Sequence, residues 1–230
     1  CFTISELYNI CRKEESTVKK FAIIGGSFNP VTKAHVEIGQ IAARELPGWQ
    51  ILYIPAPDRF LTSWKSMEKK EILSGKKRLL LLEKAVKPHG FLCEDCEVFG
   101  KTSARTYDTM QYLRDRYGQE TELVYVCGTD KLSELSTWYN PEGIFTLSKI
   151  LVIPRDGDEP EKMIEEIPFL SERRDRILVS HEPRIYPDFS ATKVRDSLKS
   201  GDGKWREFVP DEIVSDLEKI SASEQDTSIV

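Results

Sequence analysis

The sequence predicts an α/β protein: an open parallel sheet with helices on both faces, followed by a small C-terminal helical region. Short apolar runs alternate with helical stretches from residue 21 onward, which is typical of a parallel sheet covered by crossover helices. One run, over residues 21–42, also passes from a buried strand through a glycine turn into a helix. In an open sheet of this kind, ligands bind beyond the carboxyl ends of the strands.

The first strand is predicted over residues 21–24, an apolar run with β-branched residues that suits a central strand. Gly25 and Gly26 then allow a turn with close backbone approach. Thr32 lies where a helix N-cap should, just ahead of a stretch with apolar residues at helical spacing. The three features predict a strand, a turn and a helix in that order.

The later elements continue the alternation. Residues 91–99 alternate apolar and acidic side chains, which is typical of an edge strand facing water. Apolar runs predict core strands, and leucine-rich or amphipathic stretches predict helices. The core strands are expected over residues 50–54, 122–127, 149–153 and 176–180, and the helices within 79–86, over 107–117 and after residue 189.

The chain divides into three segments. We expect an N-terminal arm or appended helix over residues 1–18, one domain over residues 19–220, and a disordered polar tail over residues 221–230. Because the chain begins without Met, we also expect it to be a processed form or a fragment.

The composition restricts the partners. A formal net charge of −5 argues against broad nucleic-acid binding, which needs a basic surface, although one cleft can still be basic. No apolar run approaches the length of a membrane span, and the N-terminus does not resemble a secretory signal. We therefore expect no nucleic-acid or membrane partner and a cytoplasmic location.

The chain has five cysteines, and two of them form a C-x-x-C pair, Cys93 and Cys96. Such a pair can bind zinc or do redox chemistry, but no second Cys or His pair at useful spacing completes a zinc site. We therefore expect a structural role for this pair. An odd number of cysteines without a secretory signal fits a reducing compartment.

Two helix starts are predicted to bind anions. Thr32 and His35 share a face at the start of the first helix, where free N–H groups and partial positive charge favour a phosphate. The run lacks the Gly-Lys-Ser/Thr end of a Walker loop and the third glycine of a dinucleotide fingerprint. Near the other end of the chain, Ser190 and Thr192 can cap a second helix. Arg195 emerges on the same face, and its planar guanidinium suits phosphate oxygens.

These two runs resemble known signatures. Residues 25–35 are similar to the GGSFNPxTxxH motif of the nicotinamide/nicotinate mononucleotide adenylyltransferase family, which belongs to the nucleotidyltransferase superfamily. Residues 189–195 are similar to its ISSTxxR motif, with Ala191 in place of the second Ser. The resemblance implies a Rossmann-like fold in which Thr32 and His35 bind the phosphates of ATP, and Ala191 removes one hydroxyl that the motif offers to phosphate. The further ATP-binding residues that it implies are Gly26, Ser27, Phe28, Ser190 and Thr192.

The resemblance continues between the two motifs. Gly128 and Asp130 match the family's GxD, whose acidic side chain meets ribose hydroxyls, although Asp130 could equally cap a helix. Trp138 has the spacing of a Trp that stacks on the pyridine ring, and its alternative is a core position. Thr106 lies in a T-x-D-T segment near that ring, with Arg105 where many members have Tyr.

Two further cations complete the implied site. Lys65 resembles a phosphate-binding Lys after the second strand, and Arg155 falls where the family keeps an Arg beyond the fourth core strand. The alignment near Lys65 leaves alternatives open: Lys69, Lys70, Lys76 and Arg78.

The resemblance implies transfer of AMP from ATP to nicotinamide or nicotinate mononucleotide, with release of pyrophosphate. The attacking phosphate is already an anion, so the enzyme has to position the reactants and neutralise charge rather than supply a nucleophile. His35, Thr32, Arg195 and Lys65 are the expected catalytic residues. A Mg²⁺ ion is expected on the ATP phosphates without dedicated protein ligands.

Several alternatives remain open. The same fold and chemistry could serve another phosphorylated acceptor such as phosphopantetheine, or the chain could bind nucleotide without turnover. An RNA-ligand enzyme is disfavoured by the length and charge of the chain. The sequence leaves open the choice between amide and acid mononucleotide, a homo-oligomeric state and the role of residues 1–18.

Overall fold

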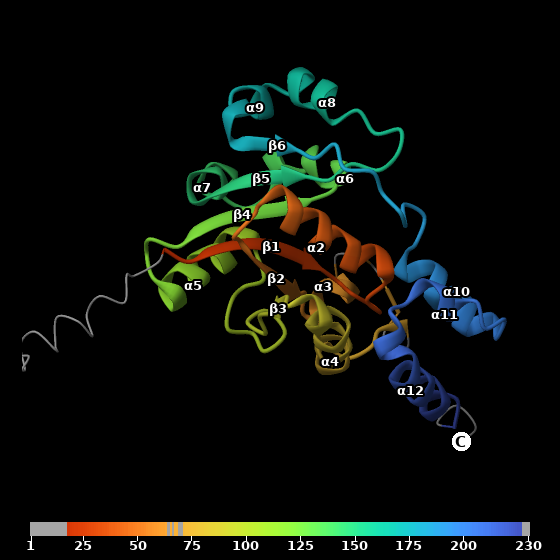
Figure 1. The fold of residues 1–230 in the computed structure, drawn as a ribbon. Coiled ribbons are helices and arrows are strands. Elements are labelled where there is room, and N and C mark those ends of the chain that lie inside the picture. Colours follow the sequence, from red (N-terminus) through yellow and green to blue (C-terminus); the bar gives the residue numbers. More distant parts are fainter. Residues whose placement is uncertain (1–17, 64, 66, 69–70, 227–230) are drawn as a thin grey trace, which may run out of the picture.

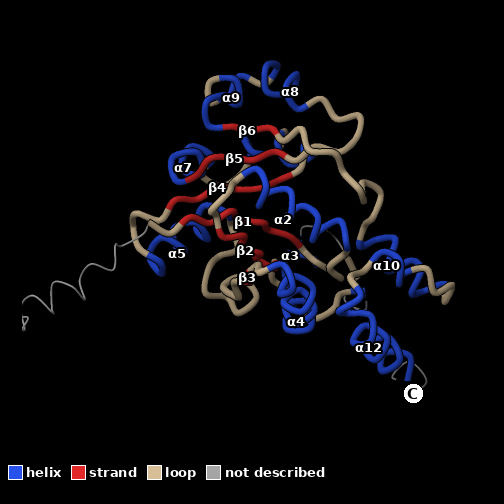
Figure 2. The backbone as a smooth tube through the Cα atoms, in the orientation of Figure 1, coloured by secondary structure: helices blue, strands red, loops and turns tan. Residues whose placement is uncertain are grey.

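The computed structural model describes residues 18–63, 65, 67–68 and 71–226. Of the predicted N-terminal segment, all but Val18 lies outside the described residues. In Figures 1 and 2 a central sheet lies between helices, and the last part of the chain forms further helices beyond one end of the sheet. The predicted fold class, an α/β open sheet with a small C-terminal helical region, is confirmed.

The described residues form a six-stranded sheet in which every pair of neighbours is parallel. The order across the sheet is β3 (Leu92–Cys93), β2 (Gln50–Pro55), β1 (Lys20–Gly26), β4 (Glu122–Cys127), β5 (Ser148–Val152) and β6 (Ile177–Val179). The chain thus builds outward from β1 in one direction and then returns to build outward from β4 in the other. At such a reversal, the crevice between the two central strands is where open sheets bind ligands.

Alternate residues of the strands enter two separate cores. In β1, Ala22 and Ile24 face one core while Phe21 and Ile23 face the other, as the two-residue period of a strand requires. The first core packs against α2 (Lys33–Glu45), α4 (Gly75–Val86), α10 (Ala191–Ser200), α11 (Trp205–Phe208) and α12 (Val214–Asp226). The second packs against α5 (Thr106–Tyr117), α6 (Thr129–Leu132), α7 (Pro141–Leu147), α8 (Pro160–Glu166) and α9 (Pro168–Ser171). The short α3 (Asp58–Ser63) follows β2, and single 3-10 turns cover Lys87–His89, Leu135–Thr137, Arg174–Arg176 and Asp211–Ile213.

Local sequence explains where the helices of the site begin. Thr32 has the extended backbone of an N-cap residue before α2. At α10 the Ser190 hydroxyl accepts a hydrogen bond from the Lys193 N–H at 3.3 Å, so Ser190 is the cap, as predicted. Thr192 lies inside the first turn instead. Gly201, in the left-handed conformation, ends this helix.

Two predicted boundaries differ from the structure. The edge strand expected over residues 91–99 is only Leu92–Cys93, because successive turn hydrogen bonds, including Lys101 N–H to the Cys96 carbonyl at 2.7 Å, fold the chain back. The expected disordered tail begins too early, since α12 continues to Asp226. No Gly or Pro interrupts that helix, and Ile213 and Leu217 anchor its start in the first core. Residues 227–230 lie outside the described part of the chain.

The cysteines of the C-x-x-C pair are free thiols. Cys96 is buried and packs in the second core, whereas Cys93 lies half-buried beside the first. Burial raises the pKa of each thiol to about 12, so neither is a thiolate at neutral pH. No helix of the described residues is long and apolar enough to cross a membrane.

Candidate active site

A pocket of about 390 Å³ opens at the carboxyl ends of β1 and β4, where the strand order reverses. Its wall includes the end of β1 with the following loop over residues 24–29, His35 in the first turn of α2, the end of β4 with Gly128, and the start of α10. The two predicted anion-binding helix starts therefore meet at one cavity, although they are far apart in the sequence.

The pocket gathers most of the residues expected to bind phosphate. The predicted residues among its lining are Gly26, Ser27, Phe28, His35, Lys65, Gly128, Thr192 and Arg195. Of the alternatives to Lys65, Lys76 is not in the lining, Arg78 is engaged elsewhere, and Lys69 and Lys70 lie outside the described residues. Lys65 is thus the lysine of this group that the structure places at the pocket.

Thr32 lies behind His35 rather than in the pocket wall. It is fully buried, and its backbone N–H donates to His35 Nδ1 at 3.0 Å. The Thr32 hydroxyl lies 2.8 Å from the same nitrogen. Because Nδ1 accepts a hydrogen bond, the neutral imidazole must bear its proton on Nε2. Thr32 therefore orients the imidazole and fixes its tautomer, and its direct contact with phosphate stays a prediction.

The environment of His35 favours the neutral imidazole. Burial lowers the pKa of His35 to about 4, and the positive charges of Lys65, Arg184 and Arg155 contribute in the same direction. The ring also meets the ring of Phe28 edge-on, with centroids 5.2 Å apart. At neutral pH His35 is consequently a neutral hydrogen-bond donor through Nε2.

Tyr53 of β2 forms a hydrogen bond with the backbone of the first turn of α2. Its hydroxyl donates to the His35 carbonyl at 2.9 Å. Gly39 makes room for this contact, since a Cβ at Gly39 would lie 2.2 Å from the Tyr53 hydroxyl oxygen. The position of His35 is therefore fixed through both its side chain and its backbone.

Arg195 connects the second motif to the first. Its Nη1 donates to the Asn29 carbonyl at 2.8 Å, and its Nη2 donates to the Thr192 hydroxyl at 3.2 Å. Both partners lie in or beside the pocket wall. The guanidinium is thereby held at the cavity, with its remaining N–H groups available to an anion.

Lys131 is a pocket residue that the sequence analysis missed. It lines the cavity, and its ammonium pairs with Glu134 at 2.9 Å. Burial lowers the pKa of Lys65, and the charges of Lys131 and Arg195 lower it further, which places the three cations near one another. The one signal for Lys131 in the sequence is its position directly after the GxD motif. Among the described lining residues there is no Asp or Glu, so the lining itself is cationic in a protein with a net charge of −5, although Asp130 and Glu134 lie close enough to raise the pKa of Lys65.

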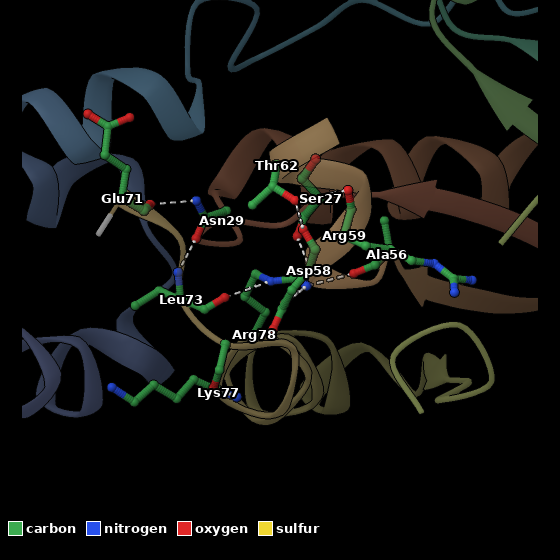
Figure 3. A network of polar contacts seen from close by, with 11 residues as sticks. Ser27, Asn29, Ala56, Asp58, Arg59, Thr62, Glu71, Leu73, Lys77 and Arg78 are labelled. Atoms are coloured by element: carbon green, nitrogen blue, oxygen red, sulfur yellow. Dashed lines mark hydrogen bonds and ion pairs between the residues drawn. The ribbon is translucent and has the colours of Figure 1, made fainter. Parts of the chain in front are cut away.

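A buried network fixes the loop after β1 from behind (Figure 3). Arg78 of α4 is fully buried and donates to the carbonyls of Ser27 at 2.6 Å, Ala56 at 2.6 Å and Leu73 at 2.9 Å, and to the Asp58 carboxylate at 2.8 Å. This role is structural, because each of the three guanidinium nitrogens already donates to one of these partners.

Asn29 ties the same loop to the segment before α4. Its side chain donates to the Glu71 carbonyl and accepts from the Leu73 N–H, each at 2.9 Å (Figure 3). By contrast, the buried Ser27 hydroxyl has no hydrogen-bond partner within the described residues. It is therefore a donor left unused at the pocket wall.

The residues expected near the pyridine ring surround a neighbouring tyrosine. Tyr125 of β4 lines the pocket and meets Trp138 edge-on, with centroids 5.6 Å apart. Burial raises the pKa of Tyr125, and a hydrogen bond with the Thr106 side chain opposes part of that rise. Trp138 is half-buried and packs against the second core without lining the cavity itself. Tyr125, which sequence reasoning also missed, thus lines the pocket where Trp138 does not.

Asp130 and Arg155 lie at the margin of the cavity. Gly128 leaves space that the Asp130 carboxylate uses, since a Cβ at Gly128 would lie 2.7 Å from Asp130 Oδ1. Arg155 is exposed, and its positive charge contributes to the lowered pKa of His35. Neither side chain is part of the lining of the pocket. Most residues predicted to bind phosphate thus lie in the lining, at what we call the phosphate end of the pocket, whereas Asp130 and Arg155 lie outside the lining.

Comparison with known proteins gives consistent results. A cytidylyltransferase-like family model matches residues 23–197. A probable nicotinate-nucleotide adenylyltransferase of Clostridium botulinum is 26% identical over 204 residues, which covers 88% of this chain and 96% of that protein. Another, from Carboxydothermus hydrogenoformans, is 28% identical over 182 residues, covering 78% of this chain and 86% of that protein.

A solved structure has a similar fold. It is nicotinic acid mononucleotide adenylyltransferase of Plasmodium falciparum, described as complexed with NaAD, with a TM-score of 0.61 and 14% identity. The match covers 86% of this chain and 95% of that chain. At this identity the comparison supports the fold of the chain and nothing finer.

We expect His35 to gain its proton only in acid. Nuclear magnetic resonance of the imidazole, assigned with a His35→Asn variant, should give a midpoint near pH 4. Because the ordinary pKa is 6.5, protonation favours the unfolded chain, and the contribution of His35 to the unfolding free energy is lost as pH falls from about 6.5 to about 4. A midpoint at pH 6 or above would contradict the buried, neutral imidazole.

We expect Arg78→Met to lower the unfolding free energy by about 3–5 kcal/mol, because it leaves three backbone carbonyls in the interior without their donor. Lys84→Met, on the same helix, is the control: it removes an exposed ion pair with Asp216 and should cost less than about 1 kcal/mol. Urea unfolding followed by circular dichroism measures both. Equal losses in the two variants would show that the network does not stabilise the loop.

Proposed function

This chain belongs to the cytidylyltransferase-like family, and from that premise we propose that it transfers AMP from ATP to a pyridine mononucleotide, nicotinate mononucleotide in the first place. One observation supports this most strongly: His35 and Arg195, from two motifs at opposite ends of the domain, line the same cationic cavity. The relatives are named as nicotinate-nucleotide adenylyltransferases, which favours nicotinate over nicotinamide as the acceptor.

In the proposed reaction an oxygen of the acceptor's 5′-phosphate attacks the α-phosphorus of ATP. A new P–O bond forms, the bond to the β-phosphate oxygen breaks, and pyrophosphate leaves. The attacking group is already an anion, which agrees with a pocket that offers hydrogen-bond donors and cations rather than a nucleophile and base. Catalysis then consists of alignment and of stabilising the negative charge that develops.

The residues divide this work by their geometry. His35 offers Nε2–H as a neutral donor whose direction Thr32 fixes. Arg195 and Lys65 bring positive charge to the same wall, and Lys131 adds a third cation that we include in the proposal. The unused Ser27 hydroxyl and the free N–H groups at the start of α10 supply further donors.

A Mg²⁺ ion fits this pocket only as a companion of the nucleotide. The lining among the described residues has no carboxylate, and no group of three or more His, Cys, Asp or Glu side chains in the described part of the chain could hold a metal ion. We propose that the ATP phosphates would hold the ion, where it would neutralise part of their charge.

The mononucleotide is proposed to lie toward Tyr125 and the margin of the cavity. Asp130 would accept hydrogen bonds from its ribose hydroxyls, and Trp138 would reach its ring if the half-buried indole turns toward the pocket. Thr106 and Arg155 complete the group around the acceptor.

The proposal is tested by pyrophosphate release from ATP with a panel of acceptors. We expect turnover with nicotinate mononucleotide, slower turnover with nicotinamide mononucleotide, and none with phosphopantetheine. His35→Ala should lower kcat by about a hundredfold or more, since it removes a donor to the transition state. Its matched control is His89→Ala, because His89 is exposed, its ring contacts Gln40 and Phe91, and it does not line the pocket.

Circular dichroism should show that both His variants keep the fold. Pyrophosphate release with phosphopantetheine but with neither pyridine mononucleotide would refute the proposed acceptor. A folded His35→Ala protein with near-normal turnover would remove this residue from the mechanism.

We expect Trp138→Ala to raise the KM for the mononucleotide roughly tenfold while the KM for ATP changes little, because aromatic stacking contributes up to about 1.5 kcal/mol. Trp49→Ala is the control, since Trp49 directly precedes β2 at the amino ends of the strands, whereas the pocket lies at their carboxyl ends. Steady-state kinetics with each substrate varied in turn measure the difference. Loss of folding or of ATP affinity instead would assign Trp138 to the core.

A further inference from the structure

A buried carboxylate lies just behind the first motif, outside the pocket. Glu37 follows His35 by two positions on α2 and is 2% exposed. It accepts a hydrogen bond from Arg184 Nε at 2.9 Å and others from the backbone N–H groups of Ile185 and Tyr186. The side chain of Arg184 is itself 5% exposed, so both charges of this pair are removed from water.

Core stability alone does not account for this arrangement. Two buried charges lose much hydration free energy, and apolar side chains of similar size would usually stabilise a core as well or better. What the carboxylate provides is direction, because one side chain accepts from a guanidinium and from two successive backbone N–H groups. Such a set of acceptors fixes a segment in one position, since any shift leaves buried groups without partners.

The segment held in this way is the connection between β6 and α10. It lies along α2: the Ser180 hydroxyl bonds to Glu45 at 2.5 Å and Glu182 pairs with Arg44 at 3.0 Å, before Glu37 is reached. Figure 1 shows this connection passing beside α2 on its way to α10. Of these contacts, those of Glu37 lie nearest to α10 in the sequence.

Aromatic packing continues from Glu37 to the helix start. Tyr186, whose N–H is bound by Glu37, stacks on Phe189 with centroids 4.9 Å apart. Phe189 meets Phe208 edge-on at 5.0 Å and directly precedes Ser190, the cap of α10. A displacement at Glu37 would therefore be passed to the turn that bears Thr192 and Arg195.

We propose that Glu37 is a positioning residue that docks residues 184–186 on α2 and so sets the spacing between His35 and Arg195 across the phosphate end of the pocket. The inference rests on the proposed function, because it assigns to that spacing the binding of the ATP phosphates. Glu37 touches neither the pocket nor a substrate, so its effect is indirect. The hydrogen bond from Arg195 to Asn29 completes the same junction on the pocket side.

The test compares Glu37→Gln with Arg44→Gln. Glu37→Gln keeps the shape of the side chain but removes the charge and one acceptor. Arg44→Gln is the matched control, because it breaks an exposed ion pair between the same two segments, farther along α2 from the motif. Isothermal titration measures the affinity of each protein for a non-hydrolysable ATP analogue with Mg²⁺ and, separately, for nicotinate mononucleotide.

We expect Glu37→Gln to weaken the ATP analogue tenfold or more and the mononucleotide less than threefold, whereas Arg44→Gln changes neither. Amide hydrogen exchange of residues 184–195 in the free protein should accelerate at least tenfold in Glu37→Gln only. A general loss of structure would weaken both ligands together, so the split between them distinguishes positioning from folding. Should Glu37→Gln not fold, Arg184→Gln removes the other half of the pair and is expected to give the same split.

Unchanged ATP affinity in a folded Glu37→Gln protein would overturn the inference, and so would equal weakening of both ligands. Unchanged hydrogen exchange would do the same, because the segment would then be docked without Glu37. A wild-type protein that binds no ATP analogue would contradict the proposed function instead, while the exchange measurement would still decide whether Glu37 docks the connection.

Discussion

The hydrogen bond from Arg195 to the Asn29 carbonyl joins the two ends of the domain across the pocket. Asn29 can offer that carbonyl because its side chain is bound to the backbone of Glu71 and Leu73, and because Arg78 holds the neighbouring Ser27 carbonyl. The loop after β1 is thus fixed from behind by α4 and its approach, and the start of α10 is attached to it from the front. This junction therefore lies where the two helix starts meet at one cavity.

The charges of the pocket differ in sign from the net charge of the chain. The chain as a whole is acidic, yet Lys65, Lys131 and Arg195 meet at a cavity whose described lining has no carboxylate. Burial, with the positive charges of Lys65, Arg184 and Arg155, keeps His35 neutral, and Thr32 then determines which nitrogen bears the proton. A neutral donor of fixed direction and three cations form a site that favours a polyanion before any ligand arrives, and such preorganised donors lose little free energy to rearrangement when charge develops.

Sequence reasoning succeeded where structure is determined locally. The core strands, the caps Thr32 and Ser190 and the family resemblance are confirmed, since each depends on residues within a few positions of one another. Sequence reasoning failed where the role of a side chain depends on a partner far away in the sequence. Glu37 and Arg78 look like ordinary residues of helix surfaces until the segments that they bind are known. Tyr125 and Lys131 were missed for a related reason: a strand or short helix does not reveal which of its faces meets the cavity. The roles of the individual site residues stay predictions.

The network also suggests why the site needs so many contacts that never reach a ligand. A pocket at a strand-order reversal is a crevice between two walls that belong to different halves of the sheet. The halves are joined directly by the pairing of β1 with β4, which ends at Ile23 and Tyr125, where the pocket begins. Beyond that point, among the described residues, side-chain hydrogen bonds hold the walls at a fixed distance. Arg78 and Asn29 do this for the loop after β1, and Glu37 does it for the approach to α10. Burying their polar groups loses hydration free energy that an apolar core would not lose, but only directional bonds can define a spacing on the scale of a phosphate group.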